Sequence, residues 1–183
     1  MKTRRSDIQK AAYDLVGLQG LEALTARNLA QELQINHATV HYYFPHREDI
    51  LHGVADFALD QFRRDREKFH EGTKSPQDRL EAEFDLAEAY CKKTSRFAKV
   101  LAGLYVASVA DATLRKKLQL IWKEWVSLVG EISKEAKVKK DSPYREPELL
   151  VATFFGAALA AQMLDGKFDS KDVMDQVYKS ALG

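Results

Sequence analysis

Residues 24–50, LTARNLAQELQINHATVHYYFPHREDI, contain two short segments whose apolar residues recur at helical spacing, with a tight turn at Gln34–Asn36 between them. Thr25 and Asn36 stand where the two helices need their N-terminal caps. Ala30 is small enough to let two helices cross closely. The pattern predicts a helix-turn-helix, a motif whose second helix enters the major groove of DNA.

The exposed side of the second helix has an unusual composition for a solvated surface. Surface helices normally carry Glu, Lys or Gln, whereas this side carries His37, Ala38, Thr39, His41, Tyr42 and Tyr43. Such side chains suit contacts with base edges and phosphates. The alternative is a plain helical hairpin with a chance aromatic cluster, but the periodicity, the turn and the boundary residues all favour the helix-turn-helix.

Residues 4–62, about a third of the chain, resemble the TetR family of bacterial regulators. Two positions depart from the family's pattern. Gln34 replaces a usual glycine at a turn position that favours positive φ, and His41 replaces a usual tyrosine that contacts phosphate. The residues that match are Thr25, Arg27, Leu29, Ala30, Ile35, Asn36, Val40, Tyr43, Phe44 and Arg47.

The resemblance implies which residues contact double-stranded DNA. One group would bind the backbone, a second would contact bases, and a third would pack on phosphate, sugar or thymine methyl groups. Two arginines near the N-terminus would form a flexible arm along the backbone. The backbone group is Thr25, Arg27 and Arg47, and the base group is His37, Ala38 and Thr39. The third group is His41, Tyr42 and Tyr43, and the arm is Arg4 and Arg5.

Helical periodicity continues through nearly the whole chain, without the alternating pattern of a strand and without an internal repeat. We expect an all-α fold of about nine helices, in which a long fourth helix starting near Arg47 joins a three-helix head to a helical body. Residues 1–46 are predicted to form the helix-turn-helix DNA-binding domain. Residues 47–183 are predicted to form an effector-binding and dimerisation domain.

A helix expected over residues 148–164 carries small side chains on two adjacent stripes, which would let another helix approach closely. TetR-like proteins, by resemblance, dimerise through their last two helices. A two-fold pair of heads would bind a palindromic operator, since one small head contacts few bases. The alternative is that this face packs inside the monomer. The expected interface residues are Ala152, Gly156, Ala157 and Ala160.

The body also carries many aromatic residues, and related regulators hold an apolar effector pocket there. His70 and Cys91 are further polar candidates beside such a pocket. The alternative is that aromatic residues at helical spacing simply form the core. The expected pocket residues are Tyr90, Phe97, Tyr105, Trp122, Trp125, Phe154 and Gln162.

Composition narrows the classes of function that are open to this chain. The 183 residues have a net charge of +1, so DNA binding has to rest on the motif and not on bulk charge. Cys91 is the one cysteine, which rules out an intramolecular disulfide. His37 and His41 have the i, i+4 spacing of metal ligands, but they fall on the DNA-facing side. We therefore expect no metal site, no cofactor and no enzymatic activity.

The chain lacks an N-terminal apolar signal region and a run long enough to span a membrane, so we expect a cytoplasmic protein without a membrane partner. The resemblance implies a sequence-specific DNA-binding regulator, a homodimeric repressor released from its operator by a small apolar effector. The alternative is a ligand-independent or protein-partnered architectural DNA-binding protein of the same fold.

Overall fold

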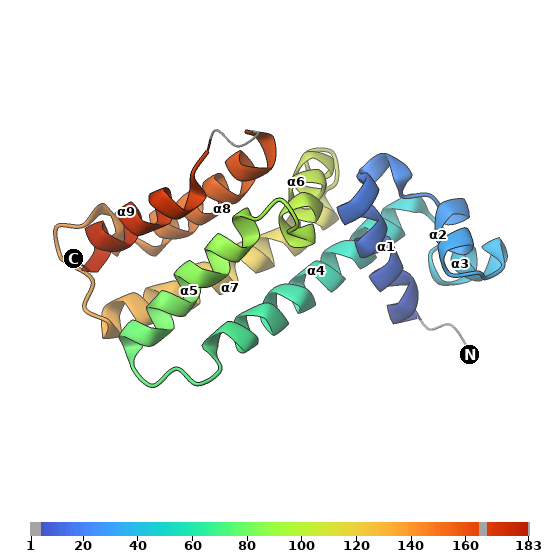
Figure 1. Ribbon diagram of the computed structural model, residues 1–183. Coiled ribbons are helices and arrows are strands. Elements are labelled where there is room, and N and C mark those ends of the chain that lie inside the picture. The colour runs from blue at the N-terminus through green and yellow to red at the C-terminus, as the bar shows by residue number, and fades with distance from the viewer. Residues whose placement is uncertain (1–4, 165–167, 183) are drawn as a thin grey trace. The chain divides into compact units, whose positions relative to one another are not determined.

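The computed structural model describes residues 5–164 and 168–182, and all regular structure in these ranges is helical (Figure 1). This confirms the all-α prediction, with nine α-helices in the described ranges. They are α1 (Arg5–Gln19), α2 (Ala26–Glu32), α3 (His37–Tyr43), α4 (Arg47–His70), α5 (Pro76–Cys91), α6 (Arg96–Ser108), α7 (Ala112–Glu135), α8 (Pro147–Met163) and α9 (Ser170–Leu182), with short 3-10 turns η1 (Leu21–Ala23) and η2 (Pro143–Arg145).

The chain forms two compact units. Unit 1 combines residues 1–62 with 99–120, and unit 2 combines residues 63–98 with 121–183. These units follow packing, whereas the boundary expected after residue 46 is one of function and stays a prediction. None of the described helices is long and apolar enough to cross a membrane.

In unit 1, α1 packs against α2, and the Tyr13 ring of α1 lies 5.0 Å from the Phe57 ring of α4. Phe44, at the end of α3, is 1% exposed and lies against α4 at Gly53. A Cβ on Gly53 would come within 2.9 Å of the Phe44 ring and 3.1 Å of Gln9 Cγ. Glycine at this point therefore lets α4 approach both neighbours, which fixes the base of the helix-turn-helix.

Unit 2 is a helical bundle in which α5, α8 and α9 lie side by side (Figure 1). Ser75 and Pro76 stand at the start of α5, and the structure shows a complete capping box there. The Ser75 hydroxyl accepts the Asp78 N–H at 3.1 Å, and the Asp78 carboxylate accepts the Ser75 N–H at 3.0 Å. Such reciprocal bonds satisfy backbone donors that the first helical turn leaves open.

Candidate nucleic-acid interface

The turn between α2 and α3 has the geometry that its sequence position demands. Gln34 has a φ of 53°, so a non-glycine residue occupies the left-handed region, as the departure from the family's glycine predicts. The Gln34 N–H donates to Gln31 O at 3.2 Å and the Ile35 N–H to Ala30 O at 2.9 Å. These two bonds form a Schellman motif, which ends α2 and turns the chain directly into α3.

Both motif helices have the N-terminal caps that the sequence predicts. Thr25 Oγ1 accepts the Asn28 N–H at 3.1 Å, and Asn36 Oδ1 accepts the Ala38 N–H at 2.8 Å. A third bond, from the Asn28 side-chain amide to Ala23 O at 2.8 Å, attaches α2 to η1. The position of α3 is therefore set by local hydrogen bonds at its start and by buried Val40 in its middle.

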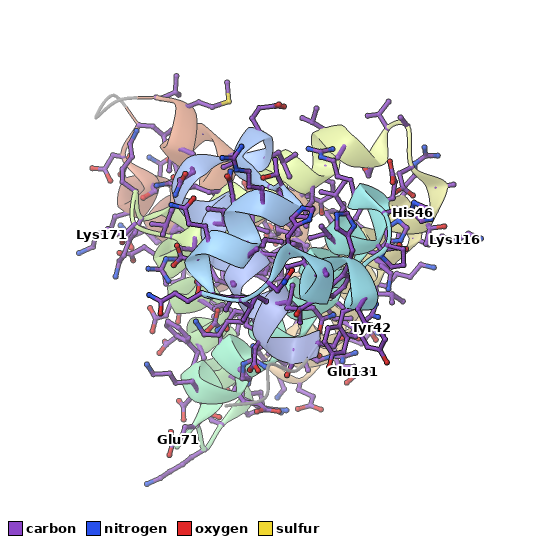
Figure 2. The ribbon with its side chains drawn as sticks, turned by 90° about the vertical axis from the view of Figure 1, so that its right-hand side faces the viewer. Tyr42, His46, Glu71, Lys116, Glu131 and Lys171 are labelled. Carbon is purple, nitrogen blue, oxygen red and sulfur yellow. The ribbon has the colours of Figure 1, made fainter. Side chains whose placement is uncertain are left out.

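The outward side of α3, residues 37–39 and 41–43, is called the recognition face from here on. His37, Ala38 and His41 are exposed on it, and Tyr42 is 79% exposed and projects from the surface (Figure 2). Thr39 and Tyr43 are half-buried. The structure thus places all six residues of the expected base- and backbone-contacting set on one accessible helix.

Ring contacts organise this face. The rings of His37 and His41 meet edge to face with centroids 4.4 Å apart, and those of Tyr42 and Tyr43 do so at 5.1 Å. Such tilted aromatic pairs are favourable arrangements that restrict side-chain rotation. The face therefore presents partly ordered aromatic groups before any partner binds.

The basic residues expected at the interface have different surroundings. Arg27 and Arg47 are exposed, and Arg47 Nη2 donates to Leu21 O at 3.2 Å. Arg5 begins α1: its Nη1 donates to Tyr43 O at 3.0 Å and its guanidinium lies 4.4 Å from the centre of the Phe44 ring. Arg5 is thus held against the motif and is not part of a free arm, while Arg4 lies outside the described residues.

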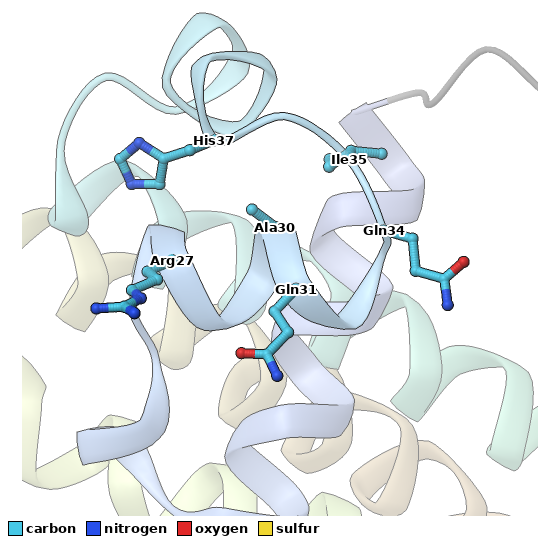
Figure 3. Close-up of a pocket in the computed structure, with 6 residues that line it drawn as sticks. All are labelled: Arg27, Ala30, Gln31, Gln34, Ile35 and His37. Atoms are coloured by element: carbon cyan, nitrogen blue, oxygen red, sulfur yellow. The ribbon is translucent and has the colours of Figure 1, made fainter.

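A hollow of about 520 Å³ lies between α2 and α3 (Figure 3). Arg27 and His37 were expected from the sequence to contact DNA and Gln34 was expected at the turn, whereas Gln31 was not among the expected residues. Gln31 is one helical turn beyond Arg27, so the i, i+4 spacing could have revealed it. The full lining of this hollow, called the notch below, is Arg27, Ala30, Gln31, Gln34, Ile35 and His37.

In unit 2 the expected pocket residues form an aromatic cluster. The Tyr90 and Phe97 rings stack with centroids 4.3 Å apart, and those of Trp125 and Phe154 lie 5.5 Å apart. All four are at least 95% buried. Trp122 is half-buried.

The other two expected pocket residues lie elsewhere. Tyr105 belongs to unit 1, unlike the aromatic cluster, and is 38% exposed. Gln162 in α8 donates to Lys92 O at 3.1 Å. The structure therefore brings five of the seven expected residues together in unit 2 as aromatic packing. Gln162 also belongs to unit 2, and Tyr105 belongs to unit 1.

A buried polar network adjoins the cluster, and the sequence analysis missed its central residue. Glu83 is fully buried; one carboxylate oxygen accepts the Trp125 indole N–H at 2.5 Å, and the other lies 2.6 Å from His70 Nε2. His70 also lines an open pocket of about 370 Å³ together with Arg63 and Glu124. Glu83 stands between two other acidic residues of α5, Glu81 and Asp85, and nothing in the local sequence indicates that it is the buried one, because its partners come from α4 and α7.

Cys91 is buried, and that burial raises the pKa of its thiol to about 11. The thiol is protonated at neutral pH, so it is a packing residue and not a reactive group.

The small-residue helix, α8, presents a continuous apolar stripe. Ala152 and Gly156 are exposed, and a Cβ on Gly156 would meet nothing within 4 Å. Ala160 is half-buried, whereas Ala157 is 5% exposed and packs inside unit 2, so the single chain leaves little of it accessible. Large apolar side chains that the sequence analysis omitted extend the stripe, namely Leu149, Leu159 and Met163.

Comparisons with known proteins agree with a helix-turn-helix in an all-helical fold. Residues 8–54 match the model of the bacterial regulatory proteins, tetR family. No curated protein matches the chain. The fold resembles a protein described as a transcriptional regulator from Saccharomonospora viridis, in complex with choline, with 15% identity, a TM-score of 0.82, and coverage of 96% of this chain and 93% of that one.

Two further solved structures show the same likeness. A transcriptional regulator from Rhodococcus sp. Rha1 has 18% identity and a TM-score of 0.80, with coverage of 97% and 94% of the two chains. A TetR transcription regulator from Haloarcula marismortui ATCC 43049 has 18% identity and a TM-score of 0.78, again with coverage of 97% and 94%. At these identities the likeness shows the fold.

Proposed function

We propose that this chain, which belongs to the tetR family of bacterial regulatory proteins, is a homodimeric repressor that binds a palindromic operator and is released from it by a small-molecule effector. The DNA-binding motif and the fold are those of transcription regulators, which are generally not enzymes.

Operator recognition rests on one observation, the composition and exposure of the recognition face. Tyr42 is 79% exposed although a tyrosine ring carries a large apolar surface. His41 beside it can donate to phosphate or accept from a base edge. An exposed aromatic and imidazole face on a rigidly capped helix is suited to a DNA groove, where rings pack on sugars and thymine methyl groups.

A selection experiment tests this. Wild-type protein is incubated with random-sequence duplex DNA, and bound sequences are amplified over several rounds. We expect a strong consensus for wild type and none for Tyr42→Ala. The control is Tyr144→Ala, which removes a tyrosine from η2 in unit 2. Enrichment that is equal in wild type and Tyr42→Ala would contradict recognition by this face.

Dimerisation is proposed through the α8 stripe. Leu149, Leu159 and Met163 are 44%, 47% and 69% exposed, so one chain leaves substantial apolar surface in water. Gly156 lies in the middle of the stripe, where a partner helix can approach closely. Self-association of this face about a two-fold axis would bury the stripe and pair two recognition faces on one operator.

Effector control is proposed through unit 2. The aromatic cluster offers apolar surface for a small apolar effector, and rings of this kind also attract organic cations such as the choline bound by the Saccharomonospora viridis regulator. Coupling between effector and operator is typically about 1–3 kcal/mol and is reciprocal. A ligand that weakens operator binding must therefore bind more weakly to the protein–DNA complex by the same factor.

An alternative is favoured by the packing itself. Trp125 and Phe154 are each 1% exposed, so these aromatic residues are closely packed without a ligand. A closed core would suit a DNA-binding protein that needs no effector or one that is controlled by a protein partner. Titration of choline and of apolar compounds, followed by the fluorescence of the two tryptophans, Trp122 and Trp125, and by operator affinity, separates the two: effector control predicts that one compound changes both.

A further inference from the structure

The notch between α2 and α3 combines two kinds of surface. Ala30 and Ile35 are its apolar residues, and Ala30 lies between the Arg27 and His37 side chains (Figure 3). Gln34 points away from that side of the hollow (Figure 3). The notch thus has an apolar floor flanked by a guanidinium and an imidazole.

The guanidinium is available to an outside acceptor. Arg27 is exposed, and among the described contacts no hydrogen bond or ion pair engages its side chain. Arginine carries five N–H donors and no acceptor. A group that occupies the notch should therefore place an acceptor next to Arg27.

The edges that DNA offers differ in how well they match this lining. A phosphate supplies acceptors but gains nothing from an apolar floor. In the major groove guanine shows two acceptors without a methyl group, adenine shows an acceptor and a donor, and cytosine shows a donor, which would face the guanidinium unfavourably. Thymine alone places an apolar group, the C5 methyl, beside an acceptor, O4.

We infer that the notch receives the edge of a thymine, with its C5 methyl against Ala30 and Ile35 and its O4 accepting from Arg27. The inference rests on the proposed function and adds a base preference from outside the recognition face. Ala30 is 7% exposed, so its methyl group forms a floor, and a longer side chain at this position would fill the space that the thymine methyl takes.

The test removes a single methyl group from the DNA. Each thymine of the selected operator is replaced in turn by deoxyuridine, which keeps O4 and loses the C5 methyl. Binding is measured by fluorescence anisotropy at fixed salt. At one position in each half-site we expect a loss of about fourfold, the factor that corresponds to burying one methyl group.

A matched pair of variants locates the effect. Ala30→Gly and Ala38→Gly each remove one methyl group from a seven-residue helix, but only Ala30 lines the notch. We expect Ala30→Gly to lower the thymine-to-deoxyuridine ratio at that position to about one, and Ala38→Gly to leave it unchanged. Each affinity ratio compares two DNAs with one protein, so a general loss of stability in a variant cancels.

Each other outcome has a definite meaning. If wild type binds the operator but no deoxyuridine substitution weakens binding, the thymine assignment is wrong while the proposed function stands. If the ratio falls in Ala38→Gly and not in Ala30→Gly, the methyl group meets α3 and the notch is not its site. If no DNA sequence is selected at all, the proposed function fails and this inference fails with it.

Discussion

His52 Nε2 in α4 lies 2.7 Å from Oδ2 of Asp111, the residue that precedes α7. The other oxygen of that carboxylate, Oδ1, accepts the Leu114 N–H at 2.9 Å. One side chain therefore both caps α7 and pairs with α4 inside unit 1. The Leu114 N–H is the main reason why the pKa of Asp111 lies below its usual value, and the His52 hydrogen bond and charge lower it further.

Replacing Asp111 should separate its two roles. Asp111→Ala removes both the cap and the pair, and loss of an N-cap costs about 1 kcal/mol. Asp111→Asn keeps a capping oxygen and removes the charge, so we expect a smaller loss. Urea unfolding at pH 7 measures both variants. Equal losses would mean that the cap contributes nothing beyond the pair with His52.

The same carboxylate predicts a pH dependence of stability. Because its pKa is lower in the folded state, the ionised form stabilises the protein above the unfolded pKa, near 3.8, and this contribution is lost as the pH falls through the lower folded value. We therefore expect the difference in unfolding free energy between wild type and Asp111→Asn to shrink as the pH falls below about 4. A difference that is constant from pH 7 to pH 3 would contradict this assignment.

Backbone contacts predict an effect on salt dependence. Arg47→Ala should weaken binding to all DNA sequences and flatten the log–log salt slope by about one unit per lost phosphate contact in each half-site, and Arg27→Ala should do the same only if its guanidinium contacts phosphate. Lys68→Ala, which removes an exposed charge from unit 2, is the control and should leave the slope unchanged. Unchanged slopes in both arginine variants would mean that neither residue contacts phosphate. For Arg27→Ala the notch predicts instead a selective loss at one thymine, without the general loss that a phosphate contact would give.

The α8 stripe predicts a clean dimerisation variant. Gly156→Glu places a charge in the middle of the stripe, and the open space around Gly156 means that the monomer can accommodate the side chain. We expect sedimentation velocity to show a dimer for wild type and a monomer for Gly156→Glu. The control, Ser127→Glu, adds the same charge at an exposed position of α7 and should remain dimeric. A dimeric Gly156→Glu protein would move the interface elsewhere.

Much of this structure could be predicted from local sequence. The caps at Thr25, Asn36 and Ser75 depend on residues within one helical turn, and the helical periodicity marks each buried face. The positive φ of Gln34 also follows from the turn alone. These features are set by neighbours in the chain, so one sequence is enough to find them.

The features that were missed depend on residues far apart in the chain. Glu83 is buried because His70 and Trp125 bond to it, and no local pattern indicates that. Ala157 and Gly156 are adjacent small residues, and the packing of α8 within unit 2 decides which one faces outward. Arg5 was expected in a flexible arm because it lies near the N-terminus. Its contacts with Tyr43 and Phe44 instead hold it against the helix-turn-helix.

Hydroxyl-radical footprinting of the selected operator tests the central claim, that two copies of the recognition face enter successive major grooves. Half-sites of a dimeric helix-turn-helix protein are centred one helical turn, about 10–10.5 base pairs, or a multiple of it apart. We predict a palindromic sequence with two symmetric protected regions at that spacing on one side of the duplex. A single protected region without symmetry, or protection that does not depend on sequence, would contradict the account.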